Sequence, residues 1–118
     1  MRYDDFEDLR VTVVDKVAEW QIVRPEKLNA MRTRTFYEIV ELGRRLNADE
    51  DVRVIVATHE GRGFSAGADL TSEDPGQETS SNPRPGPHDS MGVSKVGMAM
   101  ATIDKPTIAA INGICAGG

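Results

Sequence analysis

The chain has 118 residues, of which 39% are hydrophobic and 28% charged, a composition typical of one soluble globular domain or part of one. Fourteen Lys and Arg against nineteen Asp and Glu leave a net charge of −5, which argues against a nucleic-acid partner. No apolar run is long enough to span a membrane, and the acidic start is unlike a secretory signal. The single cysteine, Cys115, allows no internal disulfide, and we interpret it as a buried core thiol in a reducing, cytoplasmic setting.

Three apolar segments have the pattern of β-strands. Alternating apolar and polar residues predict a β-hairpin over 9–22 that turns at Asp15-Lys16. The run VRVIVAT over 52–58 carries one charge and predicts a strand buried on both faces of a parallel sheet. A second run, TIAAI over 107–111, predicts another short buried strand.

Two segments have helical periodicity. Apolar residues at three- and four-residue spacing predict a helix over 33–47, with Thr33 or Thr35 as its cap and Glu38 completing a capping box. A second, modest helix is predicted over 92–103. The resulting order of strands and helices, ββ-α-β-loop-α-β, indicates an α/β fold with crossover connections.

The stretch 71–90 contains no aliphatic or aromatic side chain and holds four of the six prolines, so it is predicted to be a mobile loop. The chain then stops after a strand, a turn and a glycine pair, a pattern that normally leads into a helix. We therefore interpret residues 1–118 as the N-terminal part of a larger domain. On that interpretation the apolar side chains of Val54, Ile55, Ile108 and Ile111 are partly exposed.

The glycine-rich turn GRGFSAG over 61–67 allows two hypotheses that its surroundings do not favour. A dinucleotide-binding fingerprint needs a helix that opens within the motif, and the residues that follow have no helical periodicity. The pattern G-x-S-x-G around Ser65 matches a hydrolase nucleophile elbow, but the histidines available as base are His59 and His88, and His88 lies in the proline-rich loop. A base beyond residue 118 stays possible.

A third hypothesis uses this turn together with a second glycine-rich turn, NGICAGG over 112–118. Each follows a predicted parallel strand, so both lie at the carboxyl edge of the sheet, where backbone N–H groups from the two turns can converge as an oxyanion hole. Three sequence blocks closely resemble the enoyl-CoA hydratase/isomerase, or crotonase, family in order and spacing. These blocks are RPEKLNAM (24–31), GRGFSAGADL (61–70) and KPTIAAINGICAGG (105–118).

The resemblance implies a crotonase-like spiral of ββα units and assigns roles to individual residues. The oxyanion hole would use the backbone N–H groups of Ala68 and Gly118. Lys27 would meet a phosphate of coenzyme A or simply be a solvated lysine, and Asp69 would lie near the ligand or cap its turn. The substrate-binding residues implied by the family pattern are Glu26, Lys27, Leu28, Ala66, Gly67, Asp69 and Leu70.

The resemblance further implies an acyl-CoA thioester substrate, no metal or redox cofactor, and an intact protein that is a homotrimer or hexamer. We expect an enoyl-CoA hydratase that adds water to a trans-2-enoyl-CoA; an isomerase, a dehalogenase, an acyl-CoA hydrolase or a non-catalytic acyl-CoA-binding module remain alternatives. The two glutamates that hydratases use would lie beyond Gly118. Glu60, Asp69 and Glu73 do not match their positions, so residues 1–118 alone are expected to be inactive.

Overall fold

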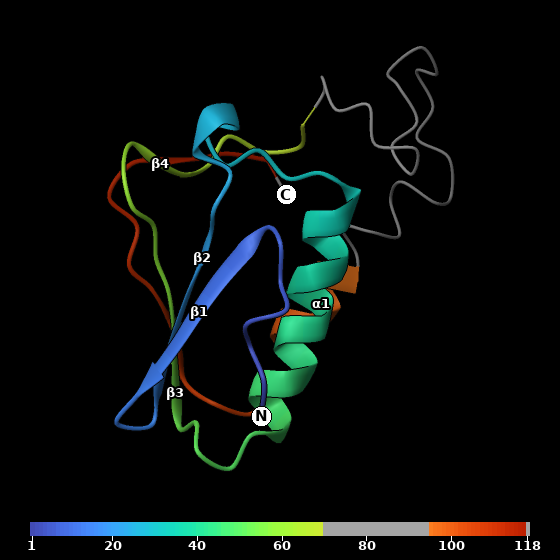
Figure 1. The fold of residues 1–118 in the computed structure, drawn as a ribbon, viewed down its shortest axis with the longest axis vertical. Coiled ribbons are helices and arrows are strands. Elements are labelled where there is room, and N and C mark those ends of the chain that lie inside the picture. Colours follow the sequence, from blue (N-terminus) through green and yellow to red (C-terminus); the bar gives the residue numbers. More distant parts are fainter. Residues whose placement is uncertain (70–94, 118) are drawn as a thin grey trace.

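The computed structural model describes residues 1–69 and 95–117 (Figure 1). The predicted loop 71–90, the start of the predicted second helix, Leu70 and Gly118 lie outside the described residues. Residues 95–101 are helical, in agreement with the predicted second helix. The other elements are β1 (Leu9–Val14), β2 (Val17–Ile22), η1 (Pro25–Lys27), α1 (Thr33–Ala48), β3 (Val54–Ala57), β4 (Gly63–Ser65), β5 (Thr107–Ala109) and β6 (Ile114–Cys115).

The main sheet has the strand order β1-β2-β3-β5. β1 and β2 form the predicted antiparallel hairpin, and β3 is parallel to both β2 and β5. The hairpin turns at Asp15 and Lys16, whose φ angles of 50° and 68° are those of a tight turn that matches the twist of the strands. The two parallel neighbours of β3 bring the carboxyl ends of β2, β3 and β5 to one edge of the sheet.

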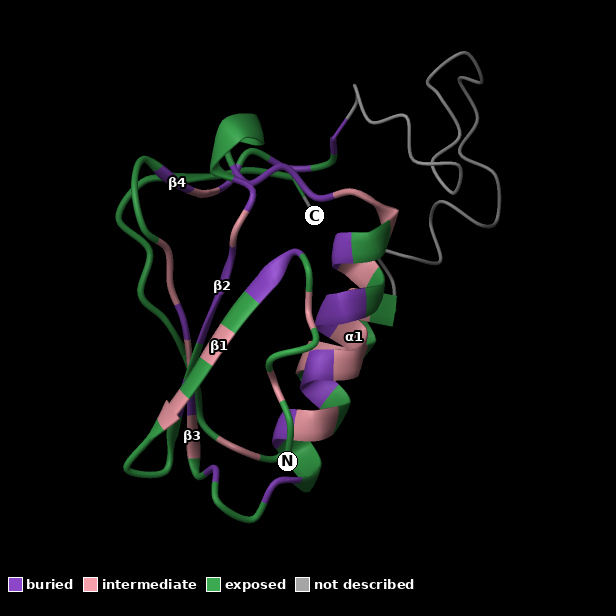
Figure 2. Cartoon of the chain, viewed as in Figure 1, coloured by how far each residue is buried: buried purple, intermediate pink, exposed green. Residues whose placement is uncertain are grey.

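α1 connects β2 to β3 and covers the sheet with its buried side (Figure 2). The helix of residues 95–101 lies beside α1, and Gly43 permits the close approach because a Cβ there would lie 3.3 Å from Met100 Cε. Val96, Met100 and Ile103 pack against the core. The core consists of Leu9, Ala18, Trp20, Ile22, Met31, Ile39, Leu42, Leu46, Val52, Ile55 and Ala57.

The predicted capping of α1 is wrong. The N-cap is Arg32, and its backbone N–H donates to the Thr35 hydroxyl in the first turn, at 3.1 Å. Glu38 takes no part in capping, because its carboxylate is buried and accepts the backbone N–H groups of residues 7–8, both at 2.8 Å. The glutamate therefore fastens the N-terminal segment to the helix, a contact that local sequence patterns do not reveal.

Exposure also differs from the sequence prediction. β3 is buried on one face and not on both faces as predicted: Ile55 points into the core and is fully buried, whereas Val54 on the opposite face is half-buried. The predicted partial exposure is therefore confirmed for Val54 and wrong for Ile55. The strand at 107–111, predicted as buried from its apolar run, is exposed throughout because β5 is the edge of the sheet. Ile108 and Ile111 are 56% and 36% exposed, which confirms the exposure predicted for these two side chains on the interpretation of residues 1–118 as part of a larger domain. Cys115 is exposed rather than a core thiol, since β6 pairs with β4 alone.

Ion pairs attach the N-terminal segment and stabilise α1. Hydrogen bonds from Arg45 lower the pKa of Asp5 to about 2, and those from Arg44 and Arg45 lower the pKa of Glu41 to about 2. Burial raises the pKa of Asp8, but hydrogen bonds from the Arg32 guanidinium and the Thr35 hydroxyl outweigh burial and the net pKa is lowered. All three carboxylates are thus stabilised in their charged form in the folded state.

We predict that stability falls in acid. The unfolded chain titrates these carboxyls near their ordinary pKa values of 3.8 and 4.5 and the folded chain lower, so the stabilisation is complete above about pH 5 and is lost as the pH falls toward 2. Thermal unfolding followed by circular dichroism from pH 7 to pH 2.5 measures the effect. Arg45→Met should flatten the curve, whereas Arg53→Met, at an exposed arginine without an ion pair among the described residues, should not. Equal slopes for both variants would contradict the assignment.

Lys105 binds the carboxyl end of α1. Its Nζ donates to the carbonyl oxygens of Leu46 and Asp49, both at 2.5 Å, where the helix leaves carbonyl groups without intrahelical donors.

We predict that Lys105→Met lowers the free energy of unfolding by about 1.5–3 kcal/mol, the usual range for hydrogen bonds to a charged group. Urea unfolding measures the change. Lys95→Met removes an exposed lysine from the neighbouring helix and serves as the control. Equal stability of the two variants would exclude the proposed role of Lys105.

Candidate functional site

The two glycine-rich turns meet at the edge of the sheet where β3 and β5 end (Figure 1). β4 and β6 pair in parallel, with Gly63 opposite Ile114 and Ser65 opposite Cys115. The pairing continues as the Ala116 N–H donates to the Ser65 carbonyl at 3.1 Å. The structure therefore brings together two segments that lie about fifty residues apart in the sequence, as the oxyanion-hole hypothesis requires.

Contact between the two turns requires glycine on both sides. Gly67 and Gly117 have φ angles of 99° and 76°, in the region that side chains rarely allow. A Cβ on Gly117 would lie 3.0 Å from the Gly67 Cα and 3.7 Å from the Ala68 nitrogen, and a Cβ on Gly67 would lie 3.2 Å from the Ala116 carbonyl oxygen. Backbone atoms of the two blocks are thus in direct contact beside the Ala68 amide.

The backbone N–H of Ala68 makes no hydrogen bond within the part of the chain that the structure describes. Met31 bridges to Ala68 in parallel fashion, with its N–H bonded to the Gly67 carbonyl at 2.7 Å and its carbonyl accepting the Asp69 N–H at 2.8 Å. In this arrangement the Ala68 N–H and carbonyl point away from Met31. Ala68 is exposed, and its N–H has no acceptor among residues 1–69 and 95–117. Gly118, the predicted second donor of the oxyanion hole, lies outside the described residues.

The segment after β2 is fixed to the same site. Leu28 and Asn29 take left-handed φ angles of 51° and 56°, and the Leu28 carbonyl accepts the Ala66 N–H at 3.0 Å. The Asn29 side chain accepts the Arg24 N–H at 2.8 Å and donates to the Gly63 carbonyl at 2.9 Å. These bonds hold η1 beside β4 (Figure 1). They leave exposed four of the predicted ligand-binding residues, namely Glu26, Lys27, Leu28 and Ala66.

Asp69 lies inside the protein. Its carboxylate pairs with the Arg24 guanidinium at 3.0 Å, and the two side chains are 3% and 11% exposed. Arg24 also donates to the Ala30 carbonyl. A buried ion pair is held only when further hydrogen bonds compensate for lost hydration, so Arg24 and Asp69 fix the loop geometry under the site. Neither motif nor periodicity indicated these roles for Arg24 and Asn29, although both residues stand in the block RPEKLNAM.

The alternative hypotheses for 61–67 do not fit the geometry. Within the described residues this segment forms a turn and β4 and contains no helix start, so it lacks the dinucleotide-binding arrangement. Ser65 is buried, and its hydroxyl accepts the Gly67 N–H at 3.1 Å instead of being presented at an elbow. His59 is engaged elsewhere, since its Nε2 accepts the Asn112 N–H.

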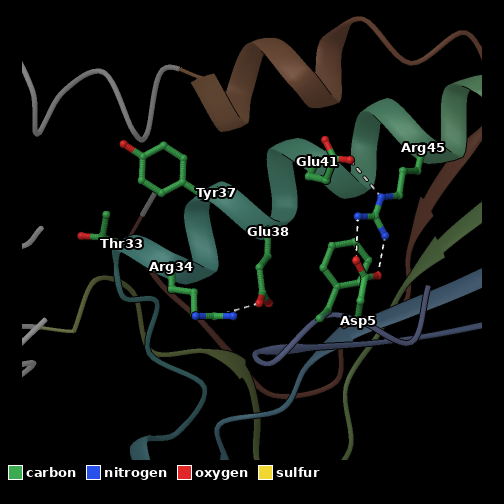
Figure 3. Close-up of a pocket in the computed structure, with 8 residues that line it drawn as sticks. Asp5, Thr33, Arg34, Tyr37, Glu38, Glu41 and Arg45 are labelled. Carbon is green, nitrogen blue, oxygen red and sulfur yellow. Dashed lines mark hydrogen bonds and ion pairs between the residues drawn. The ribbon is translucent and has the colours of Figure 1, made fainter. Parts of the chain in front are cut away.

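A pocket of about 520 Å³ lies between α1 and the N-terminal segment (Figure 3). None of the predicted site residues lines it. Its charged side chains pair with one another, Arg45 with Asp5 and Glu41 and Arg34 with Glu38. The pocket is lined by Asp5, Phe6, Thr33, Arg34, Tyr37, Glu38, Glu41 and Arg45. We assign no ligand to it.

Among the helices in residues 1–69 and 95–117, none combines the length and the apolar composition needed to span a membrane. In the same residues no three His, Cys, Asp or Glu side chains are grouped to hold a metal ion.

A model of the family described as enoyl-CoA hydratase/isomerase matches residues 13–118. The chain is 38% identical over 112 residues to 4-chlorobenzoyl coenzyme A dehalogenase-2 of an Arthrobacter species, covering 93% of this chain and 40% of the relative. It is 32% identical over 127 residues to the mitochondrial Delta(3,5)-Delta(2,4)-dienoyl-CoA isomerase of Rattus norvegicus, covering 97% and 37%. The chain thus spans about two fifths of the length of these relatives.

A solved structure shares the fold. The putative enoyl-CoA hydratase from Streptomyces coelicolor A3(2) matches with a TM-score of 0.76 at 28% identity, over 96% of this chain and 41% of that chain. The likeness confirms the predicted mixed α/β crotonase fold. With a family model that matches nearly the whole sequence and a fold that agrees, the chain belongs to the enoyl-CoA hydratase/isomerase (crotonase) family.

Proposed function

We propose that this chain contributes the oxyanion hole of an enzyme that acts on acyl-CoA thioesters. The Ala68 N–H is one donor and the Gly118 N–H is the other. The proposed role rests above all on Ala68, an exposed residue whose N–H has no acceptor among the described residues and lies beside Gly117. Family membership supports it, as do relatives whose names carry coenzyme A.

Two backbone donors at this point favour a reaction in which the thioester oxygen becomes negatively charged. A neutral carbonyl gains little from them, whereas an enolate-like oxygen gains more, so the contact stabilises the transition state over the bound substrate. The Ala68 N–H needs no reorganisation, because the neighbouring Gly67 already lies in backbone contact with Gly117. Loss of one such donor typically raises the barrier by about 2.7–4 kcal/mol.

The reaction proposed first is addition of water to a trans-2-enoyl-CoA, which gives a 3-hydroxyacyl-CoA. Isomerisation and dehalogenation of an acyl-CoA thioester are the alternatives that the relatives' names favour. Glu60 is not proposed as the base, because it is exposed and paired with Arg10. The acid–base groups are proposed to come from residues other than 1–118.

Coenzyme A is proposed to lie along the exposed residues after β2. Glu26 and Leu28 would border it, and Lys27, which forms no ion pair with any described residue, would meet a phosphate. The inward-facing carboxylate of Asp69 would act indirectly, by holding the loop through Arg24.

We predict that the full-length protein, meaning the longer protein of which residues 1–118 are proposed to be a part, consumes crotonyl-CoA. The reaction is measured as loss of the absorbance of the conjugated thioester. Residues 1–118 alone should be inactive, because they lack the proposed acid–base groups. Both should be tested for enolate absorbance on mixing with acetoacetyl-CoA, a readout of the oxyanion hole that needs no catalytic residue as base, because the buffer takes up the α-proton. Absence of both signals in the full-length protein would refute the proposed function.

A pair of substitutions separates the backbone of Ala68 from its side chain. Ala68→Ser keeps the N–H and should retain most activity, whereas Ala68→Pro removes the N–H and should lower kcat by at least about a hundredfold. Steady-state kinetics measure the effect, and circular dichroism controls for folding. A folded Ala68→Pro variant with wild-type kcat would exclude this residue from the oxyanion hole.

A further inference from the structure

The side chain of His59 joins the segment after β3 to the turn before β6. His59 follows β3, and its ring Nε2 accepts the backbone N–H of Asn112 at 2.8 Å. An imidazole nitrogen that accepts carries no proton, so the ring is neutral with its proton on Nδ1. The side chain therefore supplies a hydrogen-bond acceptor to the neighbouring backbone, as a strand carbonyl would.

Backbone hydrogen bonds join the two segments before and after this contact. These bonds run from Ala110 N–H to the Ala57 carbonyl (2.8 Å), from Ile114 N–H to the Arg62 carbonyl (3.3 Å) and from Ala116 N–H to the Ser65 carbonyl (3.1 Å). Between Ala110 and Ile114 the chain leaves β5 and turns toward β6. Of the backbone N–H groups in this turn, only that of Asn112 has an acceptor among the described residues, and the acceptor is His59.

The ring also limits where the turn can lie. A Cβ on Gly113 would be 3.2 Å from His59 Cε1 and would collide with the Arg62 carbonyl oxygen. The turn is thus pressed against His59 and Arg62 immediately before β6. Because Gly117 follows four residues later and touches Gly67, the position of the turn determines how the two glycine blocks meet.

A histidine is costly at this position unless its acceptor is needed. The Nδ1 atom is buried and has no partner among the described residues. A buried donor without a partner destabilises a fold, and a hydrocarbon side chain of similar size would fill the space without one. The requirement at residue 59 is therefore the Nε2 acceptor and not packing alone.

We propose that His59 is a positioning residue for the site: by accepting the Asn112 N–H it holds the turn before β6 so that the second glycine block meets the Ala68 amide. The consequence for catalysis rests on the proposed function, whereas the consequence for the backbone does not. His59 itself touches no reacting atom.

The backbone effect is tested on the full-length protein by hydrogen exchange with mass spectrometry. His59→Leu removes the acceptor, and exchange in peptides covering 110–117 should become at least about tenfold faster. His59→Gln places an amide oxygen near the former Nε2 position and should restore most of the protection. Unchanged exchange in His59→Leu, or equal loss in both variants, would overturn the positioning role.

The tautomer gives a second, spectroscopic test. With ¹⁵N-labelled histidine, the His59 signal, identified by its loss in His59→Gln, should show a protonated Nδ1 and an unprotonated Nε2. A proton on Nε2 at pH 7 would overturn the proposal, because that nitrogen could not then accept from Asn112.

The catalytic effect is measured as enolate absorbance with acetoacetyl-CoA and as kcat with crotonyl-CoA. His59→Leu should lower both about tenfold or more with a smaller change in KM, and His59→Gln should restore them. Tyr3→Phe loses one hydrogen bond to Asp49, at the carboxyl end of α1, and should leave both signals unchanged. If wild type gives neither signal while the exchange pattern is as expected, the proposed function fails and the backbone role of His59 stands. If both signals are present and His59→Leu leaves them unchanged, the role of His59 in the site is wrong.

Discussion

The arrangement of the site depends on the backbone contact between Gly67 and Gly117. The contact requires left-handed glycines on both sides and no Cβ between them, and it places the second glycine block against the Ala68 amide. The neighbouring strands keep this contact in place. β4 and β6 pair beneath it, and the parallel strands β3 and β5 deliver both segments to the same edge of the sheet.

Two sets of polar contacts stabilise this edge. Arg24 and Asn29 attach the segment after β2 to the first glycine-rich turn through a buried ion pair and side-chain-to-backbone hydrogen bonds. His59 supplies a nitrogen acceptor to the backbone that leads into β6. Both use polar groups in place of the apolar packing found under α1. Directional bonds suit the proposed oxyanion hole, whose donors would have to point in one direction.

Much of the fold follows from local patterns. Period-two alternation correctly predicted the hairpin, three- and four-residue spacing predicted α1, and the apolar run before the first glycine-rich turn predicted β3. The patterns failed where a partner far along the chain decides. Glu38 reads as a capping residue, but it binds the backbone of residues 7–8 across 30 positions. The apolar surroundings of Cys115 and of residues 107–111 predicted that these residues are buried. Both are exposed, because the exposure of a strand depends on whether it has neighbours.

By itself the sequence determined the family, the strand and helix order and the two glycine-rich blocks, because motifs and periodicity depend on neighbouring residues. Three contacts were decided by the tertiary structure alone. The Asp69 carboxylate is buried and pairs with Arg24, the Ser65 hydroxyl accepts the Gly67 N–H, and His59 accepts the Asn112 N–H. Each of these is a contact over space in which one side chain has several possible partners. Only the packing of strands against one another selects which partner it meets.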